Sequence, residues 1–244
     1  MTDPLGPLLA LPGVEDAVRA AREAVDAVHR HPTNRRGWPA TAAEASVRAA
    51  RASAALDGGA AAIPDTGEVS DPVLAGALRI AESIGPLLPV WQRAPLQALA
   101  RLHVLAAADL AEDDDLGRPR PTRGVSARLD LLAGLVAGGS SVPGPVLAAV
   151  VHGELLTLAP FPVASGVVAR AAARLTAIGT GLDPKGLAVP EVFYFRHQER
   201  YSAAATGFAT GDRDAVAAWL LLYCEAVEAG SREAVAIADA ALTG

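Results

Sequence analysis

Apolar residues recur along most of this chain at the three- and four-residue spacing of an amphipathic α-helix. The clearest run is the first, in which Val14, Val18, Ala21, Val25 and Val28 share one helical face. Short breaks of glycine, proline and small polar residues separate it from the runs that follow. The pattern predicts helices over residues 14–30, 41–56, 72–84, 91–110, 125–136, 143–158, 166–178, 190–208, 212–229 and 231–242.

The order of these helices predicts the fold class and the domain organisation. Residues 1–40 are expected to hold an irregular segment, rich in proline and glycine, and one helix. Residues 41–244 are expected to form a single helical domain, because the breaks are short and no low-complexity linker interrupts them. The predicted fold is therefore an all-α bundle.

Several helix ends carry recognisable signals. Thr41 is an expected N-cap, and Glu44 three residues later is its capping-box partner. The pair Asp71-Pro72 places an N-cap before a proline at the first helical position. Residues 85–89 contain two prolines and are expected to separate two helices.

Residues 112–124 form the longest charged segment of the chain. Acidic residues precede arginines, and two prolines and two glycines lie among them. Such a sequence does not form a regular helix. It predicts either a solvated surface connection or a short hairpin.

Composition supports the helical interpretation. Hydrophobic residues make up 51% of the 244 residues, while aromatic residues make up only 4%. Much of the apolar content is alanine, which has the highest helix propensity and lets helices approach closely. A sheet would draw on more β-branched and aromatic residues.

Charge and cysteine content exclude several classes of protein. A net charge of −6 leaves no overall basic surface for nucleic acid. Cys224 is the sole cysteine, so an intrachain disulfide and a multi-cysteine zinc site are excluded. No signal peptide and no apolar run of about 18 residues is evident, so we expect no membrane partner and a cytoplasmic location.

Candidate chemistry lies where the apolar helix over 143–158 gives way to a loop of small residues and a new helix from residue 166. The exposed N–H groups at the start of a helix bind anions readily. Arg170 lies one turn inside that helix and is expected to reach a bound phosphate, with Arg174 on the same face. The residues alone also allow an ordinary helix–loop–helix corner, in which the small side chains serve packing.

The run Ala-Pro-Phe-Pro-Val-Ala-Ser-Gly-Val-Val-Ala-Arg, residues 159–170, resembles the core motif of the Fic family without a gap. That motif is His-x-Phe-x-(Asp/Glu)-Gly-Asn-Gly-Arg-x-x-Arg, of which Phe161, Gly166 and Arg170 are retained. The resemblance extends over roughly residues 40–230 and includes segments that follow the motif in many bacterial members. It implies a Fic-like helical bundle with a flap, either a loop or a short hairpin, near residues 112–124.

Other positions depart from the motif. The family histidine falls on Ala159, the metal-binding acid on Val163 and the first arginine on Val167, while the asparagine falls on Ser165. In active members the histidine takes the proton from a target hydroxyl, which attacks the α-phosphate of metal-bound ATP. Alanine cannot act as this base, which contributes about 10²- to 10⁴-fold, and valine cannot bind a hard cation. We therefore predict no catalytic residue and no metal, and the sequence identifies no cofactor.

A second resemblance lies upstream. Ser53-Ala-Ala-Leu-Asp57-Gly58 is similar to the family's inhibitory motif, Ser/Thr-x-x-x-Glu-Gly/Asn, and falls in an expected inhibitory-type helix over residues 41–58. The family glutamate pairs with a core-motif arginine and blocks productive binding of ATP. The resemblance implies that Asp57 pairs with Arg170 and closes the pocket. The alternative is that the Asp57-Gly58 pair merely ends a helix.

Three functions remain open from the sequence. The leading hypothesis is a Fic-fold pseudoenzyme without adenylyl transfer, which binds a small anionic or nucleotide-like ligand or a protein partner. A second is an enzyme of altered chemistry, such as nucleotidyl or phosphoryl transfer, that uses the same pocket. A third is a homodimeric helical scaffold. The candidate ligand-binding residues are Phe161, Ser165, Gly166, Arg170 and Arg174.

Overall fold

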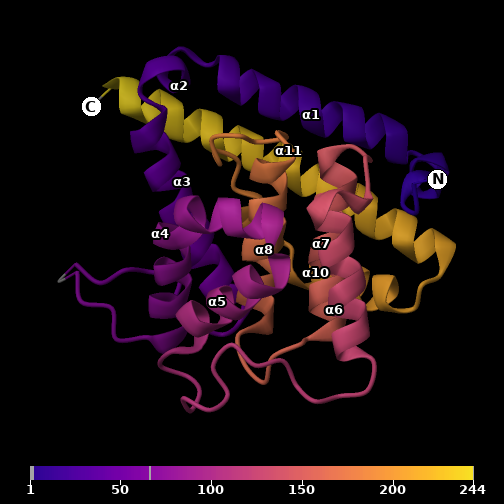
Figure 1. The fold of residues 1–244 in the computed structure, drawn as a ribbon. Helices are drawn as coiled ribbons and strands as arrows, with labels where there is room; N and C mark the ends of the chain where they lie inside the picture. The colour runs from indigo at the N-terminus through magenta and orange to yellow at the C-terminus, as the bar shows by residue number, and fades with distance from the viewer. Residues whose placement is uncertain (1–2, 66, 244) are drawn as a thin grey trace.

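The computed structural model describes residues 3–65 and 67–243, and in this part of the chain every regular element is a helix (Figure 1). The prediction of an all-α fold is confirmed. The elements are η1 (Gly6–Ala10), α1 (Val14–Arg30), α2 (Pro32–Arg36), α3 (Trp38–Leu56), α4 (Pro72–Arg93), α5 (Pro95–Ala107), α6 (Val125–Gly134), η2 (Leu135–Gly139), α7 (Gly144–Leu158), α8 (Ser165–Gly179), α9 (Pro190–Arg196), α10 (Gln198–Ala209) and α11 (Arg213–Thr243).

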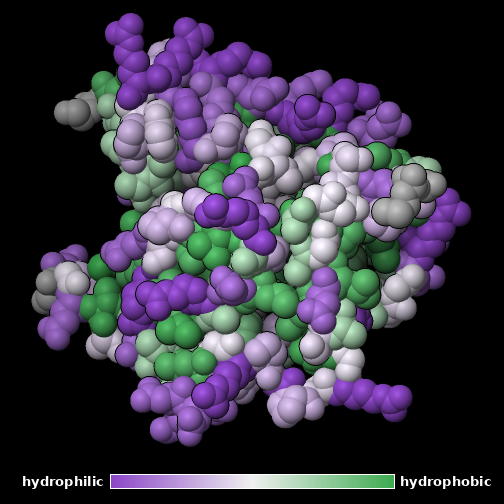
Figure 2. Space-filling view, viewed as in Figure 1, coloured by the Kyte–Doolittle hydropathy of each residue, from purple (hydrophilic) through white to green (hydrophobic). Residues whose placement is uncertain are grey.

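Helix α8 lies at the centre of the arrangement. It packs against α7, α4, α5 and α3, which surround it in Figure 1. Helix α1 lies along the long α11 and buries the valine face that its sequence predicts. Polar side chains cover the outer side of this layer in Figure 2, as expected for an amphipathic surface helix.

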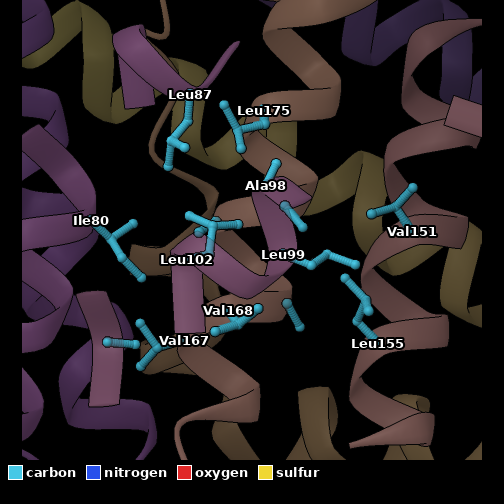
Figure 3. Packing of buried hydrophobic residues seen from close by; sticks show 14 of the residues in the cluster. Ile80, Leu87, Ala98, Leu99, Leu102, Val151, Leu155, Val167, Val168 and Leu175 are labelled. Carbon is cyan, nitrogen blue, oxygen red and sulfur yellow. The ribbon is translucent and has the colours of Figure 1, made fainter. Parts of the chain in front are cut away.

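Two apolar clusters flank α8. In the first, Leu102 of α5, Val168 of α8 and Leu155 of α7 point toward one another (Figure 3). The second lies between α1, α7 and α9–α11 and collects most of the chain's few large aromatic rings. Those rings belong to Phe193, Tyr194, Tyr201, Phe208, Trp219 and Tyr223. The first cluster therefore supports the loop between α7 and α8, and the second supports the opposite side of α8.

The predicted break over residues 85–89 is wrong, because α4 continues through it. Pro86 and Pro89 both lie inside the helix and both are exposed, while Leu87 and Trp91 face the core. The backbone carbonyls that the prolines leave without a donor can therefore bind water. Burial of one face sustains the helix that local propensity would have ended.

The continuous α4 is also longer than the apolar runs that the sequence suggested. Among the described residues, α4 is the one helix long and apolar enough to cross a membrane by length and composition. A buried core helix passes the same test. Helix α4 packs against α3, α5 and α8 and contributes Leu74, Ile80 and Trp91 to the core.

The C-terminal helices also differ from the prediction. The single helix expected over 190–208 is two helices, α9 and α10, which meet at His197. The two helices expected over 212–242 are one, because α11 continues through Gly230. A Cβ at Gly230 would lie 2.5 Å from the backbone nitrogen of Pro190. Gly230 therefore permits a close crossing of two chain segments and does not end a helix.

Gly230→Ala is expected to lower the free energy of unfolding by about 2 kcal/mol, because the added methyl meets backbone atoms that cannot rotate away. Gly207→Ala in α10 is the matched control, since its Cβ would meet Ala215 at an ordinary 3.4 Å. The control is expected to stabilise slightly through helix propensity. Urea denaturation measures both, and equal effects would show that the crossing tolerates a side chain.

Thr41 does not cap α3. The helix begins at Trp38, and the Thr41 hydroxyl is buried one turn inside it. This hydroxyl donates a hydrogen bond to Asn34 Oδ1 at 2.7 Å, and Asn34 in turn donates to the carbonyl of Val28. Thr41 therefore ties α3 to the preceding turn. The expected N-cap at Asp71 is confirmed, since its carboxylate accepts the N–H of Leu74.

Candidate functional site

The candidate site is the loop of residues 159–164 and the first turn of α8. Ala159 at the end of α7 and Ala164 before α8 both adopt left-handed backbone conformations, with φ of 38° and 56°. The Ser165 hydroxyl accepts the N–H of Phe161 at 3.1 Å and donates to its carbonyl at 3.0 Å. The loop is thus closed on itself by a side chain that the sequence placed among the ligand-binding candidates.

Ala164 holds a conformation that an L-residue adopts at a cost of about 1–2 kcal/mol. Ala164→Gly is therefore expected to raise the free energy of unfolding by about 1 kcal/mol. Ala169→Gly, in the middle of α8, is the control and is expected to destabilise by about 1 kcal/mol. Thermal denaturation of both variants checks this. If Ala164→Gly were destabilising, the backbone of Ala164 would not be strained.

A carboxylate of the protein occupies the N-terminal end of α8. Asp57 Oδ2 accepts the N–H of Val167 at 3.0 Å. A Cβ at Gly166 would lie 2.5 Å and 2.6 Å from the two Asp57 carboxylate oxygens, so glycine permits this approach. The partial positive charge and free N–H groups of a helix N-terminus favour a negative group there. Asp57 thus takes the position predicted for an external anion.

Arg170, one turn further along α8, also bonds to the carboxylate of Asp57. Its guanidinium donates to Asp57 Oδ1 at 2.6 Å, to the Ser53 hydroxyl at 2.7 Å and to the Ser53 carbonyl at 2.9 Å. The Arg170 side chain is 3% exposed and that of Asp57 is 24% exposed. Burial tends to lower the pKa of Arg170, but Tyr201 and Asp57 outweigh it and raise that pKa. The expected pairing of Asp57 with Arg170 is therefore present, and it holds α3 against α8.

Phe161 anchors the loop in the first apolar cluster. Its ring is 1% exposed and stacks on the ring of His103, with centroids 4.1 Å apart and planes 3° from parallel. His103 Nδ1 accepts the N–H of Gly117 at 2.9 Å. Burial lowers the pKa of His103, although the carbonyl of Val163 opposes the shift. The sequence did not place His103, since its position in α5 carries no signal of contact with a loop sixty residues away.

The segment 112–124 lies against the loop but is not a hairpin, since the described residues include no strand there. Pro119 and Pro121 lack the N–H groups that a strand ladder requires. One backbone bond joins the segment to the loop, from the N–H of Arg120 to the carbonyl of Pro160 at 2.7 Å. The Arg120 side chain adds bonds to the carbonyls of Phe161 at 3.0 Å and Pro162 at 3.3 Å.

Arg174 does not join the site. Its guanidinium donates to the carbonyls of Ala188 at 3.0 Å and Gly186 at 2.5 Å, and it lies 4.0 Å from Glu191. It therefore holds the connection between α8 and α9. Arg170 and Arg174 share a face of α8, but Arg174 is one helical turn further from the loop. The spacing in the sequence did not show that this turn takes Arg174 out of reach of the loop.

Three of the departures from the motif have structural consequences. Ala159 ends α7, Val163 is half-buried in the loop, and Val167 is buried in the first apolar cluster. The described residues include no group of three or more His, Cys, Asp or Glu side chains that could hold a metal. His103 Nδ1 accepts the N–H of Gly117, while its buried Nε2 has no hydrogen-bond partner among the described residues. The described residues of the site thus offer the guanidinium of Arg170 and the N–H groups at the start of α8 to an anion.

A surface groove opens beside the loop. It has a volume of about 580 Å³ and lies between α5, α6 and the segment 112–124, with the ring of Phe161 among its walls. Its apolar walls include Leu96, Leu99 and Leu129, and its rim carries Arg120 and Asp130. The spaces next to Arg170 itself are far smaller, at about 30 Å³ each. A ligand of nucleotide size therefore has room in the groove and not beside Arg170.

Comparisons with known proteins agree on the fold. No family model and no curated protein sequence matches the chain. A Fic family protein from Desulfovibrio desulfuricans superimposes with a TM-score of 0.73 at 19% identity, over 92% of this chain and 74% of that one. A fragment of Fic-1 from C. elegans gives a TM-score of 0.72 at 16% identity, over 94% and 74%. At such identities the likeness concerns the fold, and this chain has the fold of the Fic family proteins.

Proposed function

We propose that this chain is a Fic-fold binding protein without adenylyl transfer activity. Its anion site at the start of α8 is closed by Asp57, and it opens when a small anionic ligand, or an acidic group of a protein partner, displaces that carboxylate. The observation that carries the proposal is the bonding of Asp57 to both the N–H of Val167 and the guanidinium of Arg170. We propose a cytoplasmic setting for this activity.

The missing chemistry supports the part of the proposal that concerns transfer. An adenylyl transfer of the Fic type needs a base for the target hydroxyl and an oxygen ligand for the metal, and Ala159 and Val163 supply neither. Val167 cannot pair with a phosphate, and its side chain is 3% exposed. The base, the metal ligand and the phosphate-binding arginine contribute separately to the rate of transfer. The factors by which their losses slow the transfer therefore multiply.

The groove beside the loop supports a protein partner as the displacing agent. Its walls are apolar, and the segment 112–124 that forms its rim is bonded to the loop through Arg120. A partner segment bound there would lie next to the loop that ends at α8. The groove borders the loop, and the loop leads into the first turn of α8, where Asp57 is bound. Binding of a partner at the groove can therefore be linked to release of Asp57.

An assay with labelled nucleotides tests the absence of transfer. The purified chain is incubated with labelled ATP, GTP, UTP or CDP-choline and a cell lysate as a source of targets. We expect no label to enter protein above the level of a heat-denatured control. Incorporation that depends on the native chain would overturn this part of the proposal.

The two other functions left open by the sequence have less support. Ser165, the hydroxyl at the start of α8 that an altered enzyme could use, is bonded to the backbone of Phe161 as both donor and acceptor. A nucleophile needs a neighbouring base, and none contacts it among the described residues. The homodimeric scaffold stays a prediction, which sedimentation of the chain at high concentration would test.

A further inference from the structure

A small cavity lies behind α8, on the side away from the loop. It has a volume of about 30 Å³ and is lined by α1, α7, α8, α9 and α11 and the connection after α8. Three of its lining side chains carry a buried polar atom that has no hydrogen-bond partner within the described protein. These atoms are His152 Nδ1, Glu191 Oε2 and the Tyr194 hydroxyl.

The three side chains lie close together. Glu191 and Tyr194 are three residues apart on α9 and therefore share one helical face. The ring of His152 on α7 has its centroid 5.3 Å from that of Tyr194. All three residues are at least 95% buried, so bulk water does not reach these atoms. An unpaired buried polar group costs about 1–3 kcal/mol, which makes three of them together improbable without a shared ligand.

The neighbours of His152 determine which ring nitrogen carries its proton. Arg170 can only donate, and it interacts with the hydroxyl of Tyr201, so its guanidinium faces the hydroxyl oxygen. The Tyr201 hydroxyl hydrogen is then free to donate to His152 Nε2, which lies 2.8 Å away. Complete burial lowers the pKa of His152 well below its usual value, so the ring is neutral. The remaining proton is therefore on Nδ1, which faces the cavity as a donor.

The polar atoms around the cavity define its ligand. A metal ion or an ammonium ion is excluded as a partner of the N–H at Nδ1, because neither accepts a hydrogen bond. An anion would lie against the carboxyl group of Glu191, and the two arginines that also line the cavity, Arg170 and Arg174, already donate to Asp57 and to the carbonyls of residues 188 and 186. A neutral molecule that both donates and accepts fits, and the volume suits one or two molecules of water.

We propose that this cavity is a binding site for ordered water, which joins His152 Nδ1 to Glu191 Oε2 and the Tyr194 hydroxyl. The water completes a buried polar chain that starts at Asp57 and continues through Arg170, Tyr201 and His152 to α9. This polar chain connects the closed anion site to α9 on the far side of α8, in addition to the bonds that connect it to α3. Water is thus a structural partner that positions Tyr201 beneath Arg170.

Nuclear magnetic resonance of the chain with ¹⁵N-labelled histidine tests the site without any substitution. His152 is expected to show a proton on Nδ1 and a cross-peak from that proton to long-lived water. His103 is the internal control, since its Nδ1 accepts the N–H of Gly117 and its proton is therefore on Nε2. A proton on His152 Nε2, or an Nδ1 proton without contact to water, would overturn the proposal.

Crystallography gives a second, independent measurement. A map at high resolution is expected to show at least one peak of water density within hydrogen-bonding distance of two or more of the three atoms. The Tyr194→Phe variant removes one partner while it keeps the ring, and it is expected to retain the peak with weaker occupancy. A cavity without density in the wild type would show that the three atoms are satisfied by movement of the protein instead.

Discussion

Replacement of Arg170 by alanine is expected to lower the free energy of unfolding by about 3–5 kcal/mol, which is the usual cost of breaking a buried ion pair. The guanidinium makes three hydrogen bonds to Ser53 and Asp57, and its side chain is 3% exposed. The variant loses those bonds and leaves an empty volume between α3 and α8. Urea denaturation followed by circular dichroism measures the change.

An exposed arginine provides the matched control for this prediction. Arg118 lies 3.8 Å from Asp114, and both side chains are largely exposed to solvent. Arg118→Ala is therefore expected to change stability by less than about 0.5 kcal/mol. If Arg170→Ala were as mild as its control, Arg170 would not hold α3 against α8, and the closed site would lose its structural basis.

Replacement of Asp57 by alanine is expected to have the second large effect, because it removes the charge that faces a buried guanidinium. We expect a loss of about 2–4 kcal/mol in the absence of added anions. Inorganic phosphate is expected to restore part of this loss, since the N–H of Val167 and the guanidinium of Arg170 would then both face an empty anion position. The wild type is expected to respond little, because its own carboxylate fills that position.

Thermal denaturation across a phosphate series measures this response. Chloride at equal ionic strength controls for screening, and the double variant Asp57→Ala with Arg170→Ala controls for the site. The midpoint of the single variant should rise with phosphate, and that of the double variant should not. Equal midpoint shifts for wild type and Asp57→Ala would mean that phosphate binds elsewhere.

Local patterns predicted most of the fold. The valine face of α1 and the Asp71-Pro72 start of α4 follow from neighbours within a few residues, and the structure has both. The failures occur where distant packing outweighs local preference. Pro86 and Pro89 continue α4 because the opposite face is buried, and Gly230 continues α11 because another segment crosses it.

The candidate site was predictable only in part. The resemblance to the Fic core motif identified Gly166 and Arg170, the resemblance to the inhibitory motif identified Asp57, and the structure brings these three together. Arg174 was expected beside them, but its bonds to the carbonyls of residues 186 and 188 direct it away. His103 was missed because its contact with Phe161 joins elements far apart in the sequence. Such contacts depend on the packing of α5 and α8, which periodicity does not encode.

The most direct test of the closed anion site is calorimetry of inorganic phosphate binding to the wild-type chain and to Asp57→Asn, with and without magnesium. Asparagine keeps the size of the side chain and removes its charge. The account predicts that Asp57→Asn binds phosphate at least about tenfold more tightly than the wild type, a difference of about 1.4 kcal/mol. It also predicts that magnesium changes neither affinity, because Val163 offers the metal no ligand. Tight magnesium-dependent binding by the wild type, or equal affinity in the two proteins, would contradict it.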